Sequence, residues 1–112
     1  MHVVFIVLNR VELLDELLTK LNKAGIRGGT VLDSTGMVKH IDNSNDGYIL
    51  GSLKLFLDNP YPESKTIFFI VRDDQIDMIK KTLNDVVGNI ENPNTGIIFG
   101  FPLSFADGLY KK

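Results

Sequence analysis

The chain has 112 residues, which is enough for one domain with a hydrophobic core and too few for two. Its composition is that of an ordinary globular protein, with 44% hydrophobic and 23% charged residues. The formal net charge of -2 argues against a nucleic-acid surface, because binding phosphates requires a cationic field. The sequence contains no cysteine, which excludes disulfides and thiolate metal sites.

Residues 3–8 form an unbroken apolar run that predicts a buried strand. The run is too short to span a bilayer and lacks the flanks of a signal peptide, so we expect a cytoplasmic protein with no membrane insertion. Asn9 with Glu12 three positions later predicts a capping box at a helix start. The apolar stripe of this helix comprises Leu14, Leu17, Leu18 and Leu21, and Gly25 is expected to end it.

A glycine-rich stretch, residues 25–37, follows the first helix. Gly25, Gly28 and Gly29 leave the backbone free to adopt positive φ and to approach a ligand closely. The same glycines also fit a helix end and a turn into the short strand predicted over residues 30–32, and both interpretations stay open. Gly36 then opens a polar segment, residues 37–52, which predicts a long loop that acts as a lid or a partner-binding element.

The second half of the chain repeats the alternation of strand and helix. Residues 48–57 predict a short helix, with a strand as the alternative, and residues 59–62 predict a turn around two prolines. Residues 66–71 predict a second apolar strand. Asp73 and Asp74 then supply negative charge and a capping oxygen at a second helix, which Gly88 ends. A polar loop, residues 89–96, and a last strand, residues 97–101, complete the pattern.

This order predicts one domain over residues 1–112, an α+β ferredoxin-like βαββαβ sandwich. Both crossover helices cover one face of a four-stranded antiparallel sheet. The strands are apolar at nearly every position, so the opposite face would be wet in a monomer. We therefore expect that face to be buried against other subunits.

With these elements placed, the chain resembles the PII signal-transduction superfamily over nearly its whole length. The resemblance is carried by short segments in a shared order: Leu14-Asp15, Ala24-Gly25-Ile26, Gly28, Thr30-Val31, Gly36, Phe69-Ile70-Val71-Arg72-Asp73-Asp74-Gln75-Ile76 and Gly96-Ile97-Ile98-Phe99. It implies a homotrimer that binds a small effector, usually an adenine nucleotide such as ATP, ADP or AMP, in clefts between subunits. It also implies a flexible loop, here residues 37–52, that docks on a transporter, enzyme or regulator, and an association with nitrogen regulation.

The resemblance assigns effector-binding positions to individual residues. Gly28 and Thr30, beside Gly29, match positions that line the base pocket, and Gly36 matches the glycine at the base of the sensing loop. Lys39 and His40 follow that glycine, and Gly96 matches the phosphate-binding loop. The cations that the family places on the phosphates are missing, because their positions hold Ile97, Gly108 and Tyr110. Arg10, Arg27, Lys111 and Lys112 are the candidates to replace them.

Other chemistries have weaker sequence support. His40 near Asp42 and Asp46 suggests a metal site without a fixed ligand spacing, so we assign no metal ligands. A CutA-like trimer linked with divalent metals shares the architecture. Ser34 and Thr35 have no histidine at an activating distance in sequence, which argues against an enzyme. A small ferredoxin-like phosphatase that holds its anion with Arg10 or Arg27 is the enzymatic alternative, by fold analogy alone.

Overall fold

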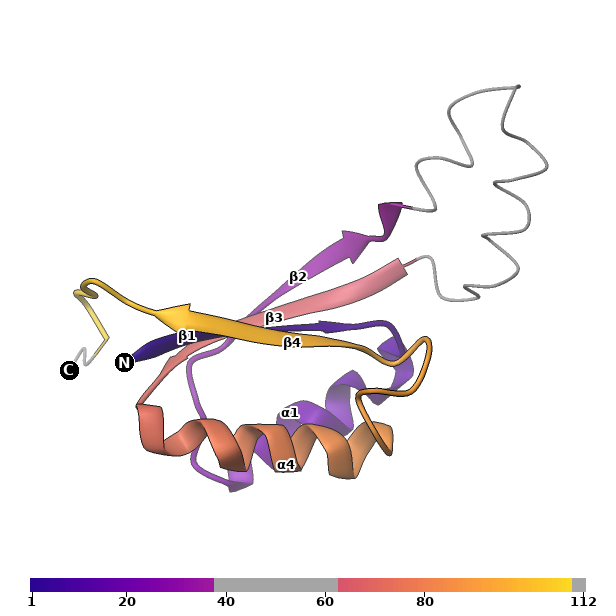
Figure 1. Ribbon diagram of the computed structural model, residues 1–112, viewed down its shortest axis with the longest axis horizontal. Helices are drawn as coiled ribbons and strands as arrows, with labels where there is room; N and C mark the ends of the chain where they lie inside the picture. Colours follow the sequence, from indigo (N-terminus) through magenta and orange to yellow (C-terminus); the bar gives the residue numbers. More distant parts are fainter. Residues whose placement is uncertain (38–62, 110–112) are drawn as a thin grey trace.

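The computed structural model describes residues 1–37 and 63–109, which form a sheet with two helices against one face (Figure 1). The strands are β1 (His2–Leu8), β2 (Thr30–Thr35), β3 (Glu63–Val71) and β4 (Gly96–Pro102). The helices are α1 (Leu14–Lys23) and α4 (Ile76–Val87), each preceded by a short 3-10 turn, η1 (Val11–Leu13) and η3 (Asp73–Gln75). Every strand pairing is antiparallel and the order is β2-β3-β1-β4. The predicted α+β class and four-stranded sheet are confirmed, and the strand order is consistent with the ferredoxin-like arrangement.

The core lies between the helices and one face of the sheet. It is built from alternate residues of the central strands and from the inner stripe of each helix. Its most deeply buried side chains are Ile6, Leu8, Leu17, Ile67, Ile79 and Leu83. The two central strands carry apolar residues at alternate positions toward the helices, as expected for strands that a helical layer covers.

The opposite face of the sheet is also apolar, and no described element covers it. The strand register places Phe5 beside Phe68 on one side and Phe99 on the other. The Phe5 and Phe99 rings stack with centroids 5.1 Å apart, and Phe101 lies 6.1 Å from Phe5. Ile97, Phe99 and Phe101 are 54%, 45% and 50% exposed. We call this surface, formed by Val3, Phe5, Val7, Phe68, Ile70, Ile97, Phe99 and Phe101, the aromatic face.

Both helix starts differ from the sequence prediction. The first helical turn begins at Val11 with Arg10 before it, so Asn9 lies too early to cap it. The Asn9 amide instead donates to the Thr95 carbonyl at 3.1 Å, which extends the strand pairing by one residue. The Glu12 carboxylate accepts from Arg10 Nε at 2.9 Å rather than from a capped backbone amide. The predicted capping box at this helix is therefore wrong.

At the second helix the acidic first turn is present, but the capping oxygen is not an aspartate. Residue Arg72 precedes the turn, and its backbone amide donates to Gln75 Oε1 at 2.9 Å. Asp74 accepts from Arg72 Nε instead. The helix ends are as predicted, with Gly25 at φ +96° after α1 and Gly88 at φ +92° after α4.

Strand β2 is longer than predicted. It continues through Asp33, Ser34 and Thr35, which pair with the first residues of β3. The Ser34 hydroxyl lies 2.6 Å from that of Ser64 and 2.8 Å from that of Thr66, and Lys65 pairs with Asp33 on the other face. These cross-strand contacts hold a polar sequence in a strand. The helix predicted over residues 48–57, the turn at 59–62 and all of the 37–52 loop except Met37 lie outside the described residues.

Candidate functional site

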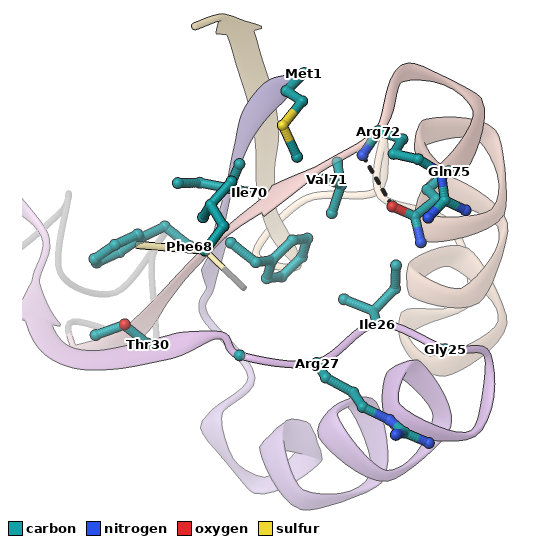
Figure 2. Close-up of a pocket in the computed structure, with 13 residues that line it drawn as sticks. Met1, Gly25, Ile26, Arg27, Thr30, Phe68, Ile70, Val71, Arg72 and Gln75 are labelled. Carbon is teal, nitrogen blue, oxygen red and sulfur yellow. Dashed lines mark hydrogen bonds between the residues drawn. The ribbon is translucent and has the colours of Figure 1, made fainter. Parts of the chain in front are cut away.

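A cavity of about 460 Å³ opens where β2 departs from β3. Strand β2 begins at Thr30 opposite Phe68, so Phe69, Ile70 and Val71 have no described strand partner on that side. Residues 25–29 bend away from this edge toward α1 and leave a hollow between them and β3 (Figure 2). Both sides of the hollow are therefore largely backbone, and β3 presents an unpaired strand edge to it.

The bend in residues 25–29 follows from how α1 ends. The Ile26 amide donates to the Leu21 carbonyl at 2.9 Å and the Gly25 amide to the Asn22 carbonyl at 3.1 Å. This pair of bonds, with Gly25 at positive φ, is a Schellman motif. Ile26, 6% exposed, packs with Leu21 in the core and fixes the direction in which the chain leaves the helix. Gly28 takes a second positive φ, +77°, before the chain enters β2.

The floor of the cavity is apolar and its rim is cationic. Ile26, Phe69 and Val71 are buried beneath it. The rim carries Arg27 on the bend and Arg72 at the end of β3, and no acidic side chain belongs to the described lining. Figure 2 shows Arg72 and Gln75 together on the α4 side, with Ile26 and Val71 between them and Arg27. The lining residues are Met1, Gly25, Ile26, Arg27, Gly28, Thr30, Phe68, Phe69, Ile70, Val71, Arg72, Gln75 and Leu109.

An ionic contact next to this rim ties the start of β1 to the turn before α4. The Asp73 carboxylate lies 2.6 Å from His2 Nδ1 and 3.3 Å from the Met1 amino group. The hydrogen bond with His2, and then that with the amino group, hold the pKa of Asp73 below its ordinary value. Asp73 is thus already paired, and it is not among the residues that line the cavity.

The structure brings some of the predicted site residues together. Gly28 and Thr30 line the same cavity, and Arg27 is the only one of the described replacement cations to do so. Arg10 follows the far end of β1 and is paired with Glu12. Gly29 lies beside Phe69, 3.4 Å from the position a Cβ would take, and borders a second hollow of about 310 Å³ between α1 and β2.

Gly36 and Gly96 do not join this cavity within one chain. Gly36 follows the end of β2, roughly 17 Å along the strand from Thr30 at 3.3 Å per residue. Gly96 pairs with Leu8 at the opposite edge of the sheet. A Cβ on Gly96 would lie 2.2 Å from the Val7 carbonyl oxygen, so strand packing alone accounts for this glycine. Lys39, His40, Tyr110, Lys111 and Lys112 lie outside the described residues.

Sequence reasoning assigned no site role to Phe68, Arg72, Gln75, Met1 or Leu109. Arg72 and Gln75 stand in the segment that carries the resemblance, immediately after an apolar strand, and that position at a strand end was the available signal. Leu109 gave no such signal, because it reaches the cavity only through the path of the chain after β4. That path starts with the Leu103 amide donating to the Met1 carbonyl at 3.0 Å.

No protein-family model matches the chain, and a search of curated proteins returned no similar sequence. Within residues 1–37 and 63–109, no group of three or more histidine or acidic side chains is placed to hold a metal ion. No helix in the same ranges has the length and apolar character needed to cross a bilayer.

Proposed function

We propose that the chain is a PII-like regulator that binds a small effector, an adenine nucleotide, in the cavity beside residues 25–29. The observation that carries the proposal is the position of Gly28 and Thr30. The resemblance assigns both to a base pocket, and both line one cavity with the open edge of β3. The match between an assignment made from sequence and an independently located hollow supports this function over a purely structural role.

The chemistry of the cavity supports a flat heteroaromatic ligand. Its floor of Ile26, Phe69 and Val71 suits an apolar ring face. The unpaired edge of β3 offers backbone donors and acceptors, and the Thr30 hydroxyl adds a further one. A ring with nitrogen atoms along its edge uses both features together, whereas an inorganic anion uses neither.

We further infer that subunits assemble through the aromatic face, as a homotrimer. Phenylalanine side chains that are about half exposed and stacked across three strands form a larger apolar surface than soluble monomers usually present. A second copy supplies a matching apolar surface, because oligomers of identical chains use the same patch on each copy. The number of three comes from the resemblance, as do the cytoplasmic location, the association with nitrogen regulation and a partner protein bound through residues 37–52.

A binding screen tests the proposed function. ATP, ADP, AMP, cyclic nucleotides and bicarbonate are each added at millimolar concentration, and melting is followed with calorimetry on the compounds that raise it. A ligand at roughly 100 times its Kd stabilises the folded state by about 2.7 kcal/mol, which is readily measured. We expect at least one adenine nucleotide to do so, and Thr30→Val to weaken it, whereas Thr19→Val on the outer side of α1 leaves it unchanged. The effector function fails if no compound shifts the melting temperature.

A further inference from the structure

The rim of the cavity offers hydrogen-bond donors that the described chain leaves unused. Arg27 makes no ion pair or hydrogen bond with any residue in the described ranges. Arg72 uses its Nε for the Asp74 carboxylate at 3.1 Å, which leaves the two terminal nitrogens of its guanidinium. Its side chain is 62% exposed, so these nitrogens are accessible to a ligand.

Gln75 adds a donor whose orientation is fixed. Its Oε1 accepts from the Arg72 backbone amide at 2.9 Å and so satisfies a free amide at the start of η3. The oxygen of the side-chain amide is therefore occupied, and the nitrogen, a donor with two hydrogens, remains. Figure 2 shows this bond and the guanidinium of Arg72 beside it. The two side chains form a donor pair on one short turn.

We propose that Arg72 and Gln75 hold the anionic group of the effector, with Arg27 as a second cation at the rim. The inference rests on the proposed function and specifies where the anion binds. A guanidinium with a neighbouring amide matches a phosphate or carboxylate, because charge-assisted bonds to two oxygens are stronger than neutral ones. The apolar floor takes the ring of the same ligand, so the ligand class is an anion that carries a flat heteroaromatic body, and a nucleoside monophosphate is its simplest probe.

This placement explains why the chain retains a site without the phosphate cations expected from the resemblance. Those cations would have stood at Ile97, Gly108 and Tyr110, and Gly96 of the expected phosphate loop lies at the far edge of the sheet. The anion in this chain is bound instead at the junction of β3 and η3. The ring stays beside Gly28 and Thr30, and the charged end points toward α4.

The test compares AMP with adenosine, which has the same ring and sugar and no charge. Calorimetry is run on the full chain, on Arg72→Ala, on Gln75→Glu and on Arg10→Ala as a control, since Arg10 is paired with Glu12 away from the cavity. Gln75→Glu keeps an oxygen for the Arg72 amide and replaces only the donor, so the start of η3 is preserved. Melting temperatures of all variants are measured without ligand, and unchanged values separate ligand binding from a structural role.

We expect AMP to bind the full chain at least about tenfold more tightly than adenosine, which corresponds to one charge-assisted contact. Arg72→Ala and Gln75→Glu should each remove most of that advantage and leave the adenosine affinity unchanged, while Arg10→Ala changes neither. Equal affinities for AMP and adenosine, or an advantage that survives both substitutions, would overturn the anion site and leave the effector function intact. If neither compound nor any other nucleotide binds, both proposals fail.

Discussion

At the scale of single residues, the contact between His2 and Asp73 makes folding stability depend on pH. The pKa of Asp73 is lowered in the folded state, chiefly by its hydrogen bond with His2, from an ordinary value of 3.8. The carboxylate therefore contributes stability that is fully present above that value and is lost as the pH falls through the lower folded-state pKa. It joins β1 to the turn before α4, next to the cavity rim.

We predict that Asp73→Asn lowers the melting temperature at neutral pH and has a much smaller effect well below pH 3.8. Thermal unfolding followed by circular dichroism across that range measures the difference. Asp74→Asn is the matched variant, because it removes the same charge from the same turn without touching His2. A destabilisation by Asp73→Asn that is equal at all pH values would show that the ionised carboxylate is not the stabilising form.

The residue that ends α1 gives a second prediction. Gly25 has φ +96° with open space around the position of a Cβ, so Gly25→Ala is opposed by backbone strain and not by a clash. We expect it to reduce the free energy of unfolding by about 1 kcal/mol, measured by urea denaturation. Gly29→Ala is the control, since Gly29 has no positive φ and its new methyl group would lie in ordinary contact with Phe69. Equal losses at both positions would contradict the role given to φ.

At the scale of elements, the helices are held chiefly by their buried stripes. Leu17 of α1 is 0% exposed in the core, whereas Leu18 packs only partly against it. We predict that Leu17→Ala costs about 2–5 kcal/mol of unfolding free energy through lost burial and the cavity left behind. Leu18→Ala should cost clearly less, and chemical denaturation of the two variants provides the comparison. A larger cost at Leu18 would mean that α1 packs in a different rotation.

The existence and type of the described elements could be predicted from sequence because burial sets a clear period in each. Residues 3–8 are apolar throughout because β1 is central in the sheet and apolar on both faces. The same reasoning failed at Asn9, because the residue after β1 completes a strand pairing with Thr95 before the helix begins. It stopped β2 too early, because Asp33 and Ser34 are held by partners on β3 that are distant in sequence.

The candidate site was predictable only in part for a similar reason. Gly28 and Thr30 could be assigned because they stand in a glycine-rich stretch after a helix. Arg72 and Gln75 come close to them only through the pairing of β2 with β3, which the local sequence does not encode. Gly96 illustrates the reverse error, since its conformation follows from close strand packing against Val7 and not from a ligand.

At the scale of the whole molecule, the aromatic face makes the chain's behaviour depend on assembly. We predict that Phe99→Asp shifts the chain toward smaller species, because a carboxylate at the centre of that face would be buried without a partner in the assembled form. Val11→Asp, on the η1 turn, places the same charge at an exposed valine away from the sheet and should leave the mass unchanged. Analytical ultracentrifugation of both variants gives the answer, and an unaltered mass for Phe99→Asp would place the interface elsewhere.

Assembly and effector binding are linked, because a cavity open along the edge of β3 gains a further wall when a neighbouring subunit closes on it. The most direct test of the account is therefore the mass of the unmodified chain in solution, measured by native mass spectrometry or sedimentation equilibrium. The account predicts a species of three times the 12.5 kDa chain. A stably folded species of a single chain, with its aromatic face in water at all concentrations, would contradict it.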